Sequence, residues 1–356
     1  MSARRVLITG GAGFIGSSLA LRLASSHPDW EVVALDNLHR RGSELNLPRL
    51  REGGVRFMHG DVREPDDLRA AGPFDGLVEC SAEPSVMAGV DGATGFLIRT
   101  NLLGAYHCLE EVARHRAQVV FLSTSRVYPV AALRKLSFSE GNTRFELDAE
   151  QRLPGASAHG VAESFPMDGA RTLYGASKLS AELLVAEYAE SFGLATVVNR
   201  CGVVAGPWQM GKVDQGVFTY WILAYHFKRP LAYIGFGGNG KQVRDLLHVA
   251  DLADLVDDQL MRPDHWAGAV VNVGGGVDVS LSLHEASTLC EQITGNSMHL
   301  SSTPATRTGD VPVYLSDCRT LGRFSDWTPQ RDARQIFEDI HAWVCENERA
   351  VAATLA

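Results

Sequence analysis

Residues 5–16 read RVLITGGAGFIG, an apolar run followed at once by a glycine-rich turn. Gly10, Gly13 and Gly16 lie between a predicted strand at Arg5–Thr9 and the start of a predicted helix. Gly10 suits a tight turn, Gly13 lets a pyrophosphate approach the backbone, and Gly16 lets helix and strand pack closely. The first N–H groups of the helix can then bind phosphate oxygens. The stretch predicts a dinucleotide-binding strand–turn–helix unit, and a plain βα turn is the alternative.

The next predicted strand, Glu31–Leu35, runs into Asp36, which lies 20 residues after Gly16. A carboxylate there can accept hydrogen bonds from the adenosine ribose and would repel a 2′-phosphate, which favours NAD over NADP. NADP remains an alternative, because three basic residues follow (His39, Arg40, Arg41) and arginine can bind a phosphate.

Further strands are predicted at Val55–Met58, Gly76–Cys80 and Val119–Ser123, with a helix at Gly95–Arg114. Repeated βα units of this size predict an α/β protein with a Rossmann-type, doubly wound parallel sheet. Ligands of such sheets bind at the carboxyl ends of the strands. We therefore expect cofactor contacts beyond the three glycines from Phe14, Ile15, Asp36, Asn37, Asp61, Val62, Ser81, Ala82 and Asn101.

The stretch RTLYGASKL, residues 171–179, places Tyr174 and Lys178 four residues apart, on one face if the stretch is helical. A phenol titrates near pH ~10, and a lysine ammonium beside it favours the phenolate. The pair can then remove a proton from an alcohol while a hydride leaves. Thr124 stands at a strand end, where its hydroxyl would face the nicotinamide. The predicted catalytic residues are Thr124, Tyr174 and Lys178, and the last two are also expected to contact the cofactor.

The residues between Thr124 and Tyr174 form an unusually long connection. Much of it, Ser137–Asp168, is polar and rich in Gly, Ser and Glu. Long loops in compact domains are usually functional or disordered. We expect a flap beside the substrate, with disorder or a role in subunit contacts as alternatives.

In the second half, strands are predicted at Thr196–Val203, Leu231–Phe236, Val243–His248 and Val270–Gly276, and helices at Ser282–Thr294 and Asp332–Glu346. We expect residues 1–199 and 243–275 to bind NAD, and residues 200–242 and 276–356 to form a smaller, mostly C-terminal substrate-binding domain. Three basic residues lie in turns marked by Gly and Pro, and together they suit binding of a diphosphate: Lys212, Arg244 and Arg307. Taken singly, each would be interpreted as an ordinary charged side chain exposed to solvent.

The chain has 356 residues, of which 45% are apolar and 21% charged, a balance typical of globular proteins. The net charge of −9 argues against a nucleic-acid or anionic-membrane partner. No apolar run reaches membrane-spanning length. Six scattered cysteines without a C-x-x-C pair suggest reduced thiols of a cytoplasmic protein, so we expect neither a disulfide frame nor a metal site.

Taken together, these motifs resemble those of extended short-chain dehydrogenases/reductases of the nucleotide-sugar epimerase and dehydratase type. The resemblance covers almost the whole chain and rests on Thr9–Gly16, Asp36, Asp61, Asn101, Ser123-Thr124, Tyr174–Lys178 and Val243–Leu252. It implies catalysis by Thr124, Tyr174 and Lys178, tightly held NAD and a nucleotide-sugar substrate. The expected substrate-binding residues are Glu83, Thr124, Arg126, Asn199, Lys212, Gln215, Arg244 and Arg307.

Within that family, Asn199–Phe218 and Gly235–His248 are most similar to CDP-sugar 2-epimerases of the paratose and tyvelose type. The family's 4,6-dehydratases place an Asp-Glu pair after the catalytic threonine, whereas this chain has Ser125-Arg126. The resemblance implies inversion of C2 through a transient keto-sugar, with 4-epimerisation as the alternative. Dehydration ranks lower, and a non-enzymatic NAD-sensing protein lower still.

Assembly is the remaining expectation. The predicted helices near Gly95–Arg114 and Tyr174–Phe192 are long enough to pair with their symmetry mates in a four-helix interface. We therefore expect at least a homodimer, and a dimer of dimers is compatible.

Overall fold

The computed structural model describes residues 3–89, 92, 94–211 and 215–355. Packing divides the chain into two compact units. The first unit comprises Met1–Thr124, Leu173–Arg200 and Leu252–Val270, and the second comprises Ser125–Thr172, Cys201–Asp251 and Val271–Ala356. We expected one part of the chain to bind NAD and the other to bind the substrate. The packing units do not test which ligand each part binds, so that division stays a prediction.

In the described part of the chain, seven strands form the main sheet in the order β14-β10-β5-β4-β1-β2-β3. Their bounds are β1 Arg5–Thr9, β2 Glu31–Asp36, β3 Arg56–His59, β4 Gly76–Glu79, β5 Gln118–Thr124, β10 Thr196–Cys201 and β14 Ala269–Val273. Strand β1 pairs in parallel with β2 on one side and with β4 on the other. The chain therefore reverses its direction of travel at β1, which is the switch point of a doubly wound sheet. The expected fold class is confirmed.

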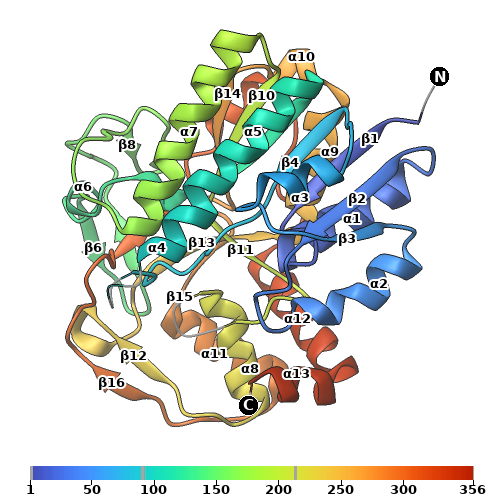
Figure 1. Cartoon of the computed structure of the whole chain (residues 1–356). Coiled ribbons are helices and arrows are strands. Elements are labelled where there is room, and N and C mark those ends of the chain that lie inside the picture. The colour runs from blue at the N-terminus through green and yellow to red at the C-terminus, as the bar shows by residue number, and fades with distance from the viewer. Residues whose placement is uncertain (1–2, 90–91, 93, 212–214, 356) are drawn as a thin grey trace. The chain divides into compact units, whose positions relative to one another are not determined.

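Helices of the first unit pack on both faces of this sheet. They are α1 Phe14–Ser26, α2 Leu47–Glu52, α3 Pro65–Ala70, α4 Thr94–Ile98, α5 Gly104–His115, α7 Leu173–Phe192, most of α9 Val249–Met261, and α10 Pro263–Trp266. Figure 1 shows α5 and α7 running side by side along one face. Alternate residues of β1 and β2, such as Leu7 and Val33, enter the apolar cluster under α3, α5 and α7. The intervening residues face the other side, where α1 packs against β1 and β2.

The helix expected at Gly95–Arg114 is present, and its winding changes near the middle. Between α4 and α5, residues Arg99–Leu103 form a π-helical turn, which holds one residue more per turn than an α-helix. The helix prediction is confirmed, and the π-helical turn within it was not predicted. Such turns often occur at functional sites, and this one contains the buried Asn101.

The second unit contains shorter strands. Strand β13, Val243–His248, pairs with β11, Val203–Ala205, with β15, Ser280–Ser282, and with β17, Val313–Tyr314. Strand β12, Ala232–Ile234, pairs with β16, Ser301–Thr303. The short helical segments are η3 Ser125–Val127, α6 Val130–Leu133, η4 Phe236–Gly238 and η5 Arg319–Arg323.

The long segment Ser137–Asp168 is ordered. It forms the antiparallel pairs β6 Phe138–Glu140 with β7 Phe145–Leu147, and β8 Ala156–Ser157 with β9 Gly160–Val161. The Phe145 amide donates to the Lys241 carbonyl at 2.9 Å, and the Val161 amide donates to the Leu315 carbonyl at 2.9 Å. Phe145 also packs in an apolar cluster with Val243 of β13. The alternative of disorder was wrong, and the role as a substrate flap stays a prediction.

Helices α8 Val217–His226, α11 Leu283–Thr294, α12 Ala333–Glu346 and α13 Glu348–Leu355 complete the second unit. Helix α8 reads VFTYWILAYH and is apolar nearly all round, as expected of a buried helix. Its Phe218 ring lies 6.0 Å from the ring of Phe337 on α12. Ser282 and Glu285 form a capping box at the start of α11. None of the helices in the described residues has the length and apolar character needed to span a membrane.

Candidate active site

The glycine turn joins β1 to α1 and keeps the start of that helix open. Gly10 has a φ of +63°, and a Cβ there would come within 2.9 Å of the Cys80 carbonyl group. A Cβ on Gly16 would lie 2.2 Å from the Gly10 carbonyl oxygen, so both positions require glycine. Gly13 precedes α1 without any side-chain cap. The first N–H groups of α1, which begins at Phe14 and Ile15, can therefore bind an anion, and the turn fits a dinucleotide pyrophosphate.

Asp36, the last residue of β2, is held against this turn. Its carboxylate accepts hydrogen bonds from the Ala12 amide at 3.1 Å and the Leu38 amide at 2.7 Å. Burial raises the pKa of Asp36, although these amides oppose the shift. A carboxylate can accept more than two hydrogen bonds, so Asp36 keeps capacity for ribose hydroxyls.

Asp61 and Asn37 lie together beyond the ends of β3 and β2. The Asn37 amide donates to Asp61 at 2.9 Å, and the Arg63 guanidinium donates to both oxygens of the same carboxylate. Burial opposes ionisation, but the hydrogen bonds from Arg63 and Asn37 outweigh it and hold the pKa of Asp61 well below its usual value. Asp61 is therefore an acceptor at all ordinary pH values.

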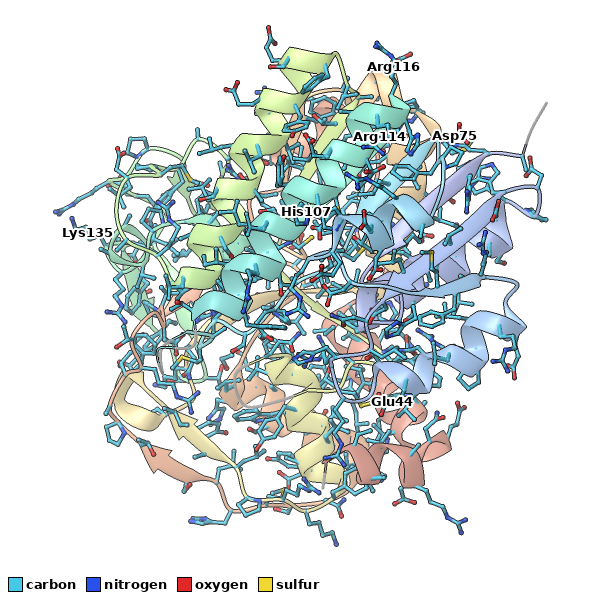
Figure 2. The ribbon with its side chains drawn as sticks, in the orientation of Figure 1. Glu44, Asp75, His107, Arg114, Arg116 and Lys135 are labelled. Atoms are coloured by element: carbon cyan, nitrogen blue, oxygen red, sulfur yellow. The ribbon has the colours of Figure 1, made fainter. Side chains whose placement is uncertain are left out.

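The loop after Asp61 is fixed to α5. His107, labelled on α5 in Figure 2, places its Nδ1 atom 2.9 Å from the Val62 carbonyl oxygen. Since that oxygen can only accept, Nδ1 carries the proton. A Cβ on Gly104 would come within 2.7 Å of the Val62 side chain, so a larger residue would displace the loop. These contacts set the position of Asp61 and Val62 at the edge of the sheet.

Asn101, in the π-helical turn, connects the loop after β4 to α7. Its side-chain oxygen accepts from the Glu83 amide at 2.7 Å, and its amide donates to the Glu83 carbonyl at 3.1 Å. The same amide donates to the Ser177 hydroxyl at 3.1 Å, and that hydroxyl donates to the Tyr174 carbonyl at 2.8 Å. Asn101 is only 1% exposed. The structure thus gives Asn101 a role in holding both the Ser81–Glu83 loop and the first turn of α7.

Tyr174 and Lys178 lie on α7, so the four-residue spacing does place them on one helix face. The Lys178 ammonium is 3.2 Å from Glu79 Oε2 and 4.6 Å from the centre of the Phe121 ring. Burial opposes its charge, but the charges of Glu79 and Tyr174 outweigh burial and raise the pKa of Lys178. Lys178 therefore stays protonated, and its charge acts on Tyr174.

Glu79 is a site residue that the sequence analysis did not single out. It ends β4, is 2% exposed, and accepts hydrogen bonds from Lys178 and from the Ser81 hydroxyl. The available signal was an acidic residue in the otherwise apolar run Leu77–Cys80. A buried carboxylate needs a cationic partner, and Lys178 of α7 supplies it.

Thr124 ends β5, which packs against α7. The preceding Ser123 donates its hydroxyl proton to Glu182 of α7, and Glu182 forms a buried ion pair with Arg200 of β10 at 2.8 Å. These contacts fix the end of β5 to the helix that carries Tyr174. The catalytic roles of Thr124, Tyr174 and Lys178 remain predictions.

The expected substrate arginines gather in the second unit around residues 307–311. Arg126 donates to the Gly309 carbonyl at 3.2 Å. Arg244 donates to Asp310 at 2.6 Å and to the Val311 carbonyl at 2.7 Å. Burial lowers the pKa of Arg244 to about 10, with a smaller contribution in the same direction from the charge of Arg126. The side chain of Arg307 makes no hydrogen bond or ion pair with any described residue. Arg126 and Arg244 therefore bind the segment that carries Arg307, and Asp310 within that segment is paired with Arg244.

The remaining expected substrate residues fare differently. Gln215 has a buried side-chain oxygen without a hydrogen-bond partner among the described residues, which leaves it able to bind a ligand. Lys212 lies outside the described residues. Asn199 is fully buried, and its amide exchanges two 2.8 Å hydrogen bonds with Gln259 of α9. These bonds join β10 to α9, and a role of Asn199 in substrate binding stays a prediction.

Comparison with known proteins gives the family. The sequence model of the NAD dependent epimerase/dehydratase family matches residues 6–274. That range begins in β1 and ends just after β14, so it covers the whole main sheet. The expected NAD cofactor agrees with this family's description.

Two curated relatives align with nearly the full chain. CDP-paratose 2-epimerase of Salmonella typhi is 30% identical over 95% of this chain and 98% of its own. A dTDP-glucose 4,6-dehydratase of Mycobacterium tuberculosis is also 30% identical, over 97% of this chain and 94% of its own. Among solved structures, UDP-glucose 4-epimerase of Thermus thermophilus in complex with NAD is 25% identical and has a TM-score of 0.75. That match covers 95% of this chain and 98% of the other.

Proposed function

The chain belongs to the NAD dependent epimerase/dehydratase family, and on that premise we propose that it inverts C2 of a CDP-sugar of the paratose and tyvelose type. The observation that carries the proposal is the sequence after Thr124. Ser125 and Arg126 stand where dehydration would need two carboxylates, and Arg126 binds the Gly309 carbonyl. The 2-epimerase relative, similar over 95% of this chain, supports the choice of CDP and of C2.

In the proposed reaction, Tyr174 acts as a phenolate and removes the proton of the C2 hydroxyl group. Thr124 donates a hydrogen bond to the same oxygen and stabilises the charge that develops on it. Lys178, held charged by Glu79, favours the phenolate. Bound NAD supplies reversible acceptance of the C2 hydride. After the keto-sugar presents its opposite face and the hydride returns, Tyr174 gives the proton back to the oxygen, so the net redox change is zero.

The substrate diphosphate is proposed to bind the arginines of the second unit. Arg307 offers a guanidinium without a protein partner among the described residues, and Arg244 offers a second one that is mostly shielded from solvent and is paired with Asp310. Planar guanidinium groups suit phosphate oxygens because they can donate two parallel hydrogen bonds. Gln215 adds a buried amide oxygen that can accept a hydrogen bond from a sugar hydroxyl. We keep Glu83 and Lys212 as proposed substrate contacts on the resemblance alone.

The purified protein is expected to carry NAD(H) without supplementation, because each cycle returns the cofactor to its starting oxidation state. Asp36 disfavours a 2′-phosphate. Cofactor released by denaturation can be identified by chromatography, and NADP as the main species would overturn the cofactor assignment.

Two assays test the reaction itself. The protein is incubated with CDP-, UDP- and dTDP-sugars without added reductant, and product stereochemistry is read by NMR. A C2-deuterated substrate should keep its label in the epimerised product and show a primary isotope effect if hydride transfer limits the rate, whereas a C4-deuterated substrate should show no primary effect. A 2-deoxy analogue should bind without turnover. Turnover of the 2-deoxy analogue would favour the alternative, 4-epimerisation, which UDP-glucose 4-epimerases among the relatives make the second candidate. Formation of a 4-keto-6-deoxy sugar would indicate a dehydratase.

A further inference from the structure

The helices at the end of the chain bring two histidines and a cysteine together. His226 is the last residue of α8, and His341 and Cys345 are four residues apart on one face of α12. One ligand atom from each lies within 4.8 Å of the others. All three belong to the second unit, and none takes part in the proposed reaction.

The distances match the edges of a zinc coordination tetrahedron. His226 Nδ1 lies 3.3 Å from His341 Nε2, and Cys345 Sγ lies 3.6 Å from the same nitrogen. With Zn–N bonds of about 2.0–2.1 Å and a Zn–S bond of about 2.3 Å, tetrahedral edges are about 3.3 Å and about 3.6 Å. Cys345 is exposed, so a small rotation of its side chain can complete the triangle.

A neighbouring carboxylate fixes one ring for metal binding. His226 Nε2 lies 3.3 Å from Glu348 Oε1, so this nitrogen donates its proton outward and Nδ1 is left as the lone-pair atom. Metal-bound histidines usually donate their other ring N–H to such a carboxylate.

A direct hydrogen bond between the two rings is the other use of this geometry. The 3.3 Å separation of the two ring nitrogens allows such a bond in the metal-free protein. Such a bond would not involve the Cys345 thiol, whereas a bound metal ion would use all three side chains. Two imidazoles and a thiolate are ligands that suit Zn²⁺.

We propose that His226, His341 and Cys345 bind one Zn²⁺ ion that links α8 to α12, with water in the fourth position. Glu348, at the start of α13, orients His226. The ion stabilises the C-terminal helices and takes no part in hydride transfer. This proposal differs from the expectation of no metal site, which followed from the spacing of the cysteines alone. Sequence spacing does not reveal a site whose ligands come from two helices far apart in the chain.

The test uses the full-length protein, stripped of metal with a chelator and then titrated with Zn²⁺ or Co²⁺. We expect one equivalent of zinc to bind, a zinc-dependent rise in Tm, and a thiolate-to-cobalt charge-transfer band with Co²⁺. Binding of no zinc, or of cobalt without the thiolate band, would overturn the proposal.

Variants assign the site. Cys345→Ser should abolish the cobalt band and weaken zinc binding by at least about a hundredfold, and His341→Gln should act alike. Glu348→Gln should weaken zinc binding by about tenfold to a hundredfold. His299→Gln, at an exposed histidine elsewhere, is the matched control and should leave binding unchanged. Because Cys345 is exposed, its variant should fold, and unchanged zinc affinity in Cys345→Ser would refute the site.

Discussion

The two regions proposed to carry function differ in how far their positive charges are balanced within the protein. In the first unit, Lys178 is 2% exposed and its charge is balanced within the protein by Glu79. In the second unit, Asp310 pairs with Arg244, but Arg126 adds positive charge close to Arg244 and Arg307 makes no ion pair with a described residue. A cation that activates a base must stay charged whether or not substrate is present. Cations that bind a substrate gain most when the ligand neutralises them.

The largest effect is expected at the base that Lys178 serves. Tyr174→Phe removes the proton acceptor and should lower kcat by about a hundredfold or more, with NAD content intact. Tyr188→Phe is the matched control, because Tyr188 lies on the same helix and binds Glu110. Steady-state kinetics with the identified substrate checks both. Near-normal turnover by Tyr174→Phe would mean that the first unit does not supply the base.

Removing the partner of Lys178 tests whether its charge is set from within. Glu79→Gln should lower the free energy of unfolding by about 3 kcal/mol, because it leaves a buried ammonium without an anion. Burial would then dominate and lower the pKa of Lys178, so the alkaline limb of the kcat–pH profile should move to lower pH.

The wild-type pH dependence follows from the raised pKa of Lys178. Its charge stabilises the fold at every pH below the ordinary lysine value, and this contribution is lost as pH rises through the raised value. Glu182→Gln is the control, since it breaks a different buried ion pair, the one between Glu182 and Arg200. It should destabilise the fold without moving the pH profile. A profile unchanged in Glu79→Gln would show that Glu79 is only structural.

A smaller effect is expected for the arginines. Arg307→Ala should raise KM about tenfold, the value of a charge-assisted hydrogen bond, with little change in kcat or Tm. Arg244→Ala should raise KM and also lower Tm, because Asp310 and the Val311 carbonyl lose their donor. Arg323→Ala, at an exposed arginine, is the control. A loss of stability in Arg307→Ala, or an unchanged KM, would break the contrast between the two regions.

The smallest effect on chemistry is expected from the exposed apolar residues of α5 and α7. Tyr106, Leu183 and Phe192 are 38%, 63% and 49% exposed on these helices. We propose that they pair with the same helices of a second copy. Leu183→Lys should dissociate the dimer in sedimentation experiments, whereas Val277→Lys, at another exposed apolar residue, should not. A wild-type monomer at micromolar concentration would contradict this proposal.

The sequence predicted the features that depend on local pattern. The strand bounds of β1, β2 and β13 follow from apolar runs, and the turn at Gly10–Gly16 follows from glycine spacing. Other features depend on partners distant in sequence. Glu79 bonds Lys178, and Asn199 bonds Gln259. In both pairs the partner lies far away in the sequence, so the sequence pattern could not reveal the contact. Helix α8 was missed because a uniformly apolar segment has no periodicity from which to infer a helix.

The π-helical turn at Arg99–Leu103 determines how this chain tolerates changes in length. A π-turn arises when one residue is inserted into an α-helix, and each residue of an α-helix advances by about 100° around its axis. Deleting one residue here would restore regular winding only by rotating either α4 or α5 through that angle. The rotation would take His107 off the Val62 carbonyl or Asn101 off the Glu83 loop. A single-residue deletion at this turn is therefore expected to break one of two separate contacts, whichever helix rotates.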